Sequence, residues 1–299
     1  MLTGRLLAFL SFLFGFLPHR VALSLGAALG VVLWVFSKKK VDRSESRCVS
    51  ALGLGVTRAR AVVRASYMNM GRSGVEFARL YKMRPLSSFV SIEGRGHLDE
   101  AVSRGRGVII MSAHLGNWEL AGAALVAEGY ALSPIYTSQR NKGGVNDWIE
   151  QKRTNDTGMT TIPSEGTAMR KIFRSLAERK ILVFLQDLDA RREGKIVPFL
   201  GIPASCATGI IKLYRKFSSP VIPAVCLRHP DGLHHTVYIN KILSDFSDED
   251  GNSFGINMEK SLKMCNNVLG SWVIDNPEQW MWILDKWGYT LKNVRCAAL

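Results

Sequence analysis

The stretch that decides the fold is Gly107-Val-Ile-Ile-Met-Ser-Ala-His-Leu-Gly-Asn-Trp-Glu119. Its apolar run from Gly107 to Ala113 is short and bounded by glycine and polar residues, which predicts a buried β-strand. Asn117 is a favourable helix N-cap, and the run from Trp118 to Glu128, stopped by Gly129, predicts a helix. A buried strand leading directly into a helix is typical of an α/β protein.

His114 and Glu119 lie at the junction of this strand and helix. On a single helix, a separation of five residues would rotate the two side chains by roughly 140°, at about 3.6 residues per turn. They converge if His114 ends the strand and Glu119 lies in the first helical turn, at the carboxyl end of a strand, where α/β proteins place their chemistry. A carboxylate on one imidazole nitrogen leaves the other nitrogen free as a base. We therefore expect His114 as a catalytic base that Glu119 orients; the alternative is a purely structural histidine.

Four motifs of this chain resemble those of the lipid A biosynthesis acyltransferases, the lauroyl/myristoyl transferase family. The segment from His114 to Glu119 is similar to the family's His-x4-Glu motif. Three others follow the family's order, so that the resemblance covers about residues 1 to 290: Tyr67-Met-Asn-Met-Gly-Arg72 with Glu76, Val197-Pro-Phe-Leu-Gly-Ile-Pro-Ala204, and Pro277-Glu-Gln-Trp-Met-Trp282 with Trp287.

The chain departs from the family pattern at two places. Many members carry Asp-Gln-Asp after the central strand, whereas this chain has Asp187-Leu188-Asp189. The family often has an arginine directly after the tyrosine of the next strand, but here the nearest arginine is Arg140, four residues beyond Tyr136. Both departures bear on which substrate the protein binds rather than on the type of reaction that it catalyses.

The resemblance implies an acyltransferase that moves a fatty acyl chain from a thioester, on acyl carrier protein or coenzyme A, to a hydroxyl of a membrane glycolipid. The expected acceptor is a lipid A precursor at the cytoplasmic face of the inner membrane. No cofactor and no metal is expected, and no Ser in a G-x-S-x-G elbow is present to form an acyl-enzyme. The alternatives are a lysophospholipid or glycerol-phosphate acyltransferase, a hydrolase that uses the same pair on water, and a non-catalytic membrane-binding protein.

Four residues are expected to bind substrate. Arg140 and Arg153 follow the Tyr136 strand, and arginine binds phosphate bidentately, although either could be a solvated surface charge. Asp187 follows an apolar strand and belongs to the site by resemblance, although by sequence alone it could cap a turn. The backbone amides entering the helix at Asn117 would stabilise the thioester oxyanion, helped by the positive helix end.

The charge balance of the chain limits its partners. Lys and Arg number 39 against 25 Asp and Glu, a formal net charge of +14, which suits nucleic acid, an anionic membrane surface or an acidic protein. No helix-turn-helix, zinc-finger spacing or RNA-binding aromatic signature is present, so nucleic acid is disfavoured. The five cysteines are widely spaced without C-x-x-C, which indicates reduced thiols in the cytoplasm and no zinc site.

The N-terminus contains two apolar runs, Leu6 to Leu17 and Val21 to Phe36, followed by Lys38-Lys39-Lys40. Each run is shorter than the roughly 20 residues that span a bilayer. We expect residues 1–37 to be an uncleaved membrane anchor and residues 38–299 to be the catalytic domain. A signal peptide and two buried core helices are the alternatives.

The remaining chain alternates between strand and helix patterns, which predicts a mixed, mostly parallel central sheet covered by helices. The last two strands are separated only by a short turn at 230–232 and should form an antiparallel hairpin. The tryptophans at 280, 282 and 287 would either pack the core or lie at a membrane interface. Strands are expected near 88–93, 107–113, 131–137, 159–163, 181–187, 220–228 and 234–242, and helices near 58–82, 117–128, 143–156, 166–178, 205–217 and 256–274.

Overall fold

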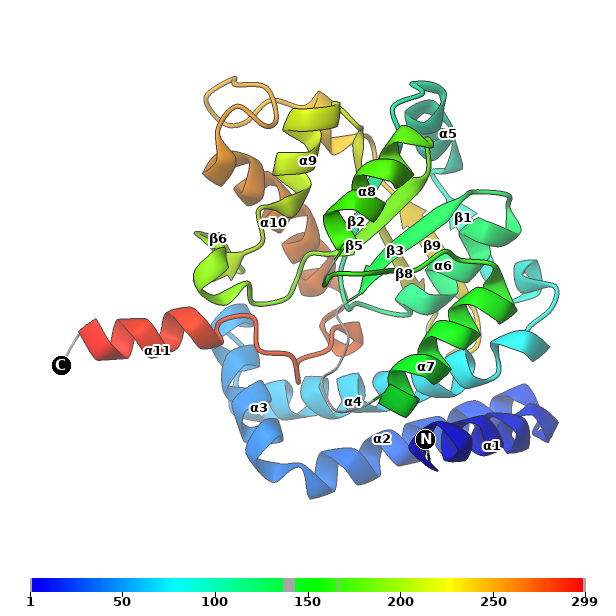
Figure 1. The fold of residues 1–299 in the computed structure, drawn as a ribbon. Helices are drawn as coiled ribbons and strands as arrows, with labels where there is room; N and C mark the ends of the chain where they lie inside the picture. Colours follow the sequence, from blue (N-terminus) through cyan, green and yellow to red (C-terminus); the bar gives the residue numbers. More distant parts are fainter. Residues whose placement is uncertain (1, 137–142, 166, 298–299) are drawn as a thin grey trace.

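The computed structural model describes residues 2–136, 143–165 and 167–297. A seven-stranded mixed sheet lies between layers of helices, and a separate two-stranded hairpin lies beside it (Figure 1). The predicted fold class is therefore confirmed. Arg140 falls outside the described residues.

The strand order of the main sheet is β1-β9-β8-β2-β5-β3-β4. The last two strands form the predicted antiparallel hairpin, and the other neighbouring pairs in the described sheet are parallel. The strands are β1 (Val90–Glu93), β2 (Val108–Ser112), β3 (Leu132–Tyr136), β4 (Ile162–Pro163), β5 (Ile181–Leu185), β8 (Val221–Arg228) and β9 (His235–Ile239), with β6 (Lys195–Phe199) and β7 (Ile202–Cys206) in the separate hairpin.

Helices cover both faces of the sheet and extend along its lower side (Figure 1). They are α1 (Leu2–Phe16), α2 (His19–Phe36), α3 (Lys38–Leu52), α4 (Val56–Ala78), α5 (Arg95–Ser103), α6 (Trp118–Ala127), α7 (Gly143–Gln151), α8 (Ala168–Ala177), α9 (Gly209–Phe217), α10 (Met258–Asp275) and α11 (Gly288–Ala297). The helix predicted over 143–156 ends in a π-helical turn, Lys152–Thr157, of the kind often found at functional sites.

The sequence did not predict the hairpin β6–β7, and it placed the start of a helix at 205, inside β7. Proline usually argues against a strand because it cannot donate to the ladder, and here Pro198 pairs with Pro203 in this edge hairpin. Helix α9 begins only at Gly209. Helices α3, α5 and α11 were also missed.

Alternate residues of β2 enter two separate cores, as the pleat of a strand requires. Ile109 and Met111 belong to the core on one face of the sheet, and Val108 and Ile110 to the core on the other. The first of these cores also contains the three C-terminal tryptophans 280, 282 and 287, which are 0%, 0% and 1% exposed. Their burial decides between the two alternatives in favour of core packing.

The two N-terminal helices lie along the outside of α4 (Figure 1). Helix α2 approaches it through small residues: a Cβ added to Gly30 would lie 2.2 Å from the Tyr67 carbonyl oxygen, and one added to Gly71 would lie 2.0 Å from the Gly26 carbonyl oxygen. Such close backbone approach is possible only with glycine. Among the described residues, His19–Phe36 is the one helix whose length and composition would suffice to cross a membrane.

Candidate active site

The parallel register of β2 and β5 brings His114 and Asp187 together. Ser112 pairs with Leu185, and each of the two site residues lies two positions beyond its partnered strand residue. The His114 Nδ1 and Asp187 Oδ1 atoms are 2.8 Å apart, and the His114 backbone N–H donates to Asp187 Oδ2 at 2.8 Å. One carboxylate therefore fixes both the ring and the backbone of the histidine.

Asp187 is only 1% exposed and accepts a third hydrogen bond, from Trp280 Nε1, at 2.8 Å. Burial by itself would raise the pKa of Asp187, but the His114 charge and the bonds from His114 and Trp280 outweigh it and lower that pKa below its ordinary value. The ionised carboxylate accepts a hydrogen bond from the Nδ1–H group of His114. Nε2 of His114 then carries the lone pair that a general base needs.

The contact predicted between Glu119 and His114 is replaced by the contact between Asp187 and His114. Glu119, in the first turn of α6, forms an ion pair with both Nε and a terminal nitrogen of Arg153, and the Nε contact measures 3.0 Å. Trp118 Nε1 also donates to Glu119, at 3.1 Å. Burial alone would lower the pKa of Arg153, but Glu119 outweighs it and raises that pKa.

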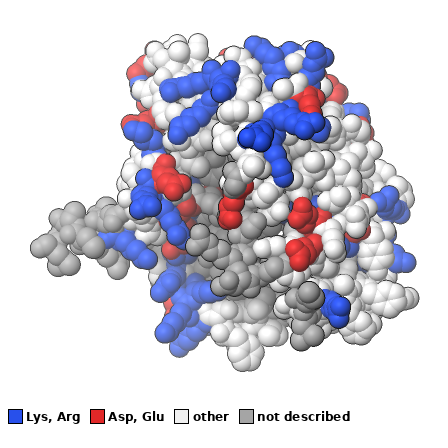
Figure 2. All heavy atoms as spheres, in the orientation of Figure 1, with Lys and Arg blue, Asp and Glu red and all other residues white. Residues whose placement is uncertain are grey.

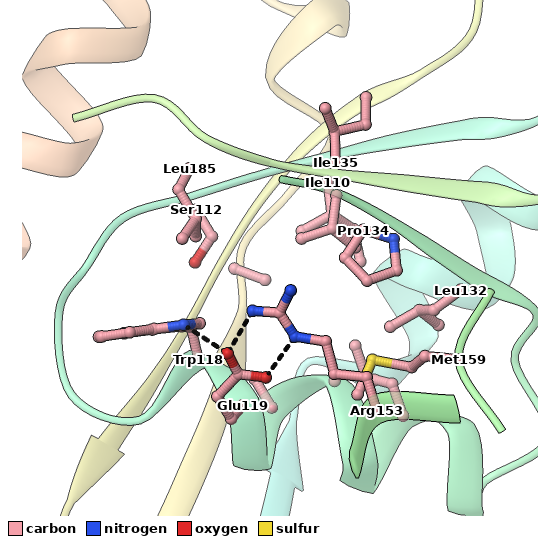
Figure 3. Close-up of a pocket in the computed structure, with 15 residues that line it drawn as sticks. Ile110, Ser112, Trp118, Glu119, Leu132, Pro134, Ile135, Arg153, Met159 and Leu185 are labelled. Carbon is pink, nitrogen blue, oxygen red and sulfur yellow. Dashed lines mark hydrogen bonds and ion pairs between the residues drawn. The ribbon is translucent and has the colours of Figure 1, made fainter. Parts of the chain in front are cut away.

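An apolar pocket lies between α6 and strands β2, β3 and β5, with the Glu119–Arg153 ion pair at its polar end (Figure 3). Its cavity volume is about 50 Å³, within a recess of about 610 Å³ that includes open solvent. Trp118 joins the pocket to the base, because its ring lines the pocket and packs edge-on against His114 with centroids 4.9 Å apart. The apolar lining consists of Ile110, Trp118, Ala121, Gly122, Leu125, Leu132, Pro134, Ile135, Met159, Val183, Leu185 and Ala224.

The Asn117 side chain makes structural contacts, while the role predicted for the backbone amides at this helix start stays a prediction. It is 1% exposed, and its Oδ1 accepts from the Leu120 backbone N–H at 3.1 Å, which caps α6. Its Nδ2 donates to Glu76 Oε2 at 2.7 Å. Both ends of this side chain are therefore occupied within the protein.

Sequence reasoning missed the residues that hold the Asp187 loop. Lys286 is 0% exposed, and its Nζ donates to the backbone carbonyls of Gln186 and Leu188, at 3.3 and 3.0 Å. Leu188, which stands where many family members have glutamine, thus contributes its carbonyl, while its side chain is 42% exposed. A lysine inside a tryptophan-rich segment was the only available signal.

The model of one protein family, described as bacterial lipid A biosynthesis acyltransferase, matches residues 3–288. The chain belongs to this family. The relatives named below are 28% identical to the chain or less, so the comparisons show the family and no single substrate.

Three relatives illustrate the range of this family. A phosphatidylinositol mannoside acyltransferase of Mycobacterium tuberculosis is 28% identical over 182 residues, which are 58% of this chain and 57% of that protein. The chain thus spans little more than half of that relative's length. A lipid A biosynthesis acyltransferase of Haemophilus influenzae is 21% identical, covering 92% of this chain and 84% of the relative. A lipid A biosynthesis palmitoleoyltransferase of Escherichia coli is 19% identical, covering 89% and 85%.

Proposed function

We propose that the protein transfers a fatty acyl chain from a thioester to a hydroxyl of a membrane glycolipid. The observation that carries the proposal is the pair of His114 and Asp187 beside an apolar pocket, in which Nε2 of the imidazole has no hydrogen-bond partner among the residues that the structure describes. Family membership supports the same reaction class.

The chemistry follows from the tautomer of His114. Its Nε2 takes the proton of the acceptor hydroxyl as that oxygen attacks the thioester carbonyl, and Asp187 stabilises the imidazolium that forms. The tetrahedral intermediate collapses with cleavage of the carbon–sulfur bond, and the imidazolium returns the proton to the thiolate. The products are an ester and a free thiol, and the histidine is regenerated.

The pocket and the start of α6 suit the acyl donor. The apolar lining would bury the acyl chain. The Leu120 amide donates to the Asn117 cap, so the amides of Trp118 and Glu119, at the positive end of α6, would stabilise the oxyanion of the intermediate. Arg153, held by Glu119 at the polar end of the pocket, would contact a phosphate of the donor arm or of the acceptor.

The relatives support a sugar-bearing lipid as acceptor. Two of the three names above specify lipid A biosynthesis, and the third specifies a phosphatidylinositol mannoside. We propose a lipid A precursor as the first candidate and a mannosylated phospholipid as the second. Acyl carrier protein and acyl-CoA both fit as donor, because both present an acyl thioester on a phosphopantetheine arm.

We further propose that residues 1–37 attach the enzyme to the cytoplasmic face of the inner membrane and that residues 38–299 form the catalytic domain. Because α2 packs along α4, the outer faces of α1 and α2 would enter the interface without spanning the bilayer. Figure 2 shows few charges over these helices at the lower right and basic groups where the sequence passes into α3. The exposed apolar side chains are Leu6, Phe9, Leu10, Phe12, Leu13, Phe16, Val21, Leu25, Leu29, Val32, Leu33, Val35 and Phe36.

The reaction is tested by mass spectrometry of the lipid products. Full-length protein is incubated in detergent with acyl carrier protein thioester or acyl-CoA and each candidate glycolipid, and acylated lipid is separated from free fatty acid. We expect acylated lipid from the wild type and a loss of roughly 10²- to 10⁴-fold in His114→Ala with an unchanged melting temperature. Free fatty acid as the main product would indicate a hydrolase, and near-normal turnover in His114→Ala would refute the assigned base.

Membrane attachment is tested by flotation with vesicles that contain anionic lipid. A triple substitution of Leu25, Leu29 and Leu33 by glutamine, on the outer face of α2, should reduce the bound fraction strongly. The matched control substitutes Met169, Ile256 and Ile274, which are equally or more exposed elsewhere on the surface. Equal binding of the two folded variants would refute the proposed orientation.

A further inference from the structure

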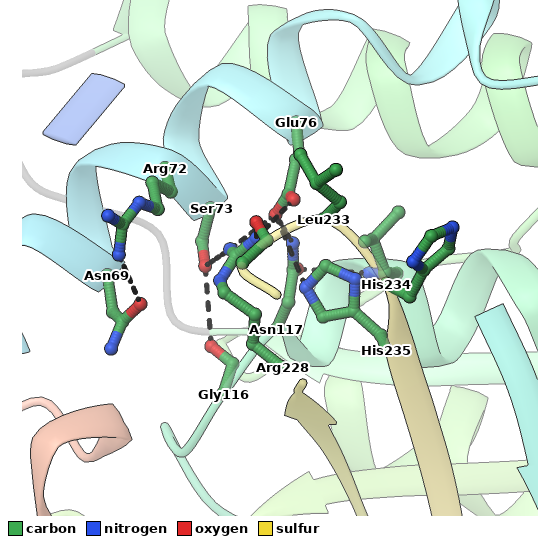
Figure 4. Close-up of polar contacts among 12 residues, drawn as sticks. Asn69, Arg72, Ser73, Glu76, Gly116, Asn117, Arg228, Leu233, His234 and His235 are labelled. Atoms are coloured by element: carbon green, nitrogen blue, oxygen red, sulfur yellow. Dashed lines mark hydrogen bonds and ion pairs between the residues drawn. The ribbon is translucent and has the colours of Figure 1, made fainter. Parts of the chain in front are cut away.

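A second buried carboxylate lies beside the catalytic loop, on the side away from Asp187. Glu76 of α4 is 0% exposed and accepts from Asn117 Nδ2 at 2.7 Å and from both terminal nitrogens of Arg228, one of them at 2.7 Å (Figure 4). His235 Nε2 lies 3.6 Å from Glu76 Oε2. Helix α4, strands β8 and β9 and the start of α6 thus converge on one carboxylate.

Glu76 stays ionised although water is excluded from it. Burial alone would raise the pKa of Glu76, but Arg228, His235 and the bond from Asn117 outweigh it and lower that pKa. Buried ion pairs recover their desolvation cost only in part, so such a pair is weak evidence for added stability. Its position beneath the site points instead to a role in fixing geometry.

The loop from His114 to Asn117 is bound to its surroundings at nearly every residue. The Asn117 backbone N–H donates to the Cys226 carbonyl at 2.9 Å, and the Gly116 N–H donates to the Gln279 carbonyl at 3.0 Å. Gly116 has φ +67° and passes so close to β8 that an added Cβ would lie 1.8 Å from the Cys226 oxygen. Two side-chain contacts then link the loop to α4. The Ser73 hydroxyl donates to the Gly116 carbonyl at 3.4 Å, and the shorter bond, at 2.7 Å, joins Asn117 Nδ2 to Glu76 (Figure 4).

We propose that Glu76 is a positioning residue for acyl transfer: through Asn117 it fixes the 114–117 loop to α4, so that His114 Nε2 stands at the mouth of the apolar pocket. The inference rests on the proposed function of His114. It also gives α4 two roles, because the face of α4 away from the loop carries α2.

Asn117→Ser separates positioning from capping. Serine is also a favourable N-cap and accepts from the helix amides, but it is too short to reach Glu76. We expect kcat to fall roughly ten- to hundredfold, since a displacement of about 1 Å costs that much, with KM within about twofold. The matched control is Asn257→Ser, which makes the same change at the cap of α10, where Asn257 Oδ1 accepts from Glu259 and Lys260 amides; its kcat should be unchanged.

Glu76→Gln tests the other end of the link. Its kcat should fall by a similar factor, and the double variant with Asn117→Ser should lose less than the product of the two single effects. If Glu76→Gln does not fold, Asn117→Ser alone decides. A change confined to KM, or a kcat of Asn117→Ser within twofold of the wild type, would overturn the proposal.

Hydrogen exchange provides a readout that does not require acyl transfer. The amides of Gly116 and Asn117 should exchange faster in Asn117→Ser, while those of α10 and the central sheet stay protected. Unchanged exchange of these two amides would overturn the inference even if activity falls. If the wild type lacked acyl transfer but the two amides still responded, the proposed function would fail while the structural link would stand.

Discussion

Asp187 and Glu76 hold the 114–117 loop from two sides, and both are buried, ionised carboxylates that accept several hydrogen bonds. The two carboxylates differ in the side chains that they hold. Asp187 holds a histidine that is partly exposed, with 16% of its side chain accessible, and whose Nε2 has no hydrogen-bond partner within the described part of the chain. Glu76 holds an arginine and an asparagine that are both buried.

The difference teaches that a lowered carboxylate pKa does not by itself identify a catalytic group. Asp187 can act through His114, because it holds the proton on Nδ1, leaves the lone pair on Nε2 and stabilises the imidazolium that forms. An arginine cannot lose its proton in the physiological range, so it offers no such base. Glu76 therefore contributes geometry, and Asp187 contributes both geometry and charge.

The largest expected effect distinguishes the two carboxylates by activity. In Asp187→Asn, the side-chain oxygen should keep its two bonds, from the His114 backbone N–H and from Trp280 Nε1. The amide NH₂ then faces the ring nitrogen Nδ1 of His114. The imidazole proton then moves to Nε2, and kcat should fall roughly 10³- to 10⁴-fold. The control is Asp189→Asn, because the Asp189 carboxylate accepts from the backbone amides of Arg191 and Tyr289; its kcat should change a few-fold at most. Similar losses in both variants would contradict the assignment.

The second effect distinguishes them by stability. Glu76→Gln leaves Arg228 buried without its full counter-charge, which should lower the free energy of unfolding by about 3–5 kcal/mol. Asp187→Asn should lower it less, since its partner histidine can be neutral. Urea unfolding of both variants measures this, and a larger loss for Asp187→Asn would reverse the comparison.

The third effect is the pH dependence of the Glu76 side. Burial, together with Arg228, His19 and His229, lowers the pKa of His235 to about 4 against the opposing effect of Glu76. Because the unfolded chain protonates this histidine first, the free energy of unfolding should fall as pH drops from about 6.5 to about 4, by up to about 3 kcal/mol, and the contribution should level off below. His235→Leu should remove this part of the slope; parallel curves for wild type and variant would exclude it.

The smallest effect concerns the Asp187 side. Trp280→Phe keeps an aromatic ring but removes the hydrogen bond to Asp187. This should cost about 1 kcal/mol in the transition state, or roughly fivefold in kcat. Because that bond helps to lower the pKa of Asp187, the acid side of the pH profile of kcat should shift to higher pH. The control Trp282→Phe removes an equally short bond, to the Pro277 carbonyl, and should leave the profile in place. A shift in both variants would mean that packing, rather than the hydrogen bond, is responsible.

Local patterns were sufficient to predict most of the sheet. The apolar β-rich runs gave each strand of the main sheet, and the short turn at 230–232 gave the β8–β9 hairpin, because these signals lie within a few residues. The hairpin β6–β7 was hidden by its prolines, and α3 by its charged sequence with few buried residues.

The site was predicted only in part for a related reason. Sequence proximity suggested that Glu119 orients His114, but the partner was set by which strands are neighbours. The pairing of Ser112 with Leu185 is a long-range contact that no local pattern encodes. Lys286 and Trp280 reach Asp187 and its loop from the far end of the chain, so their roles were visible only in three dimensions.

The contacts that complete the Asp187 loop have a consequence for synthesis of the protein. His114 and Asp187 are 73 residues apart, Asp187 and Trp280 are 93 apart, and Gln186 and Lys286 are 100 apart. A nascent chain that has not yet emerged beyond residue 279 lacks both Trp280 and Lys286, which support Asp187 and its loop, although α1 and α2 have already emerged. The His114–Asp187 pair would thus be complete only after synthesis has passed residue 286, when Trp280 and Lys286 reach Asp187 and its loop.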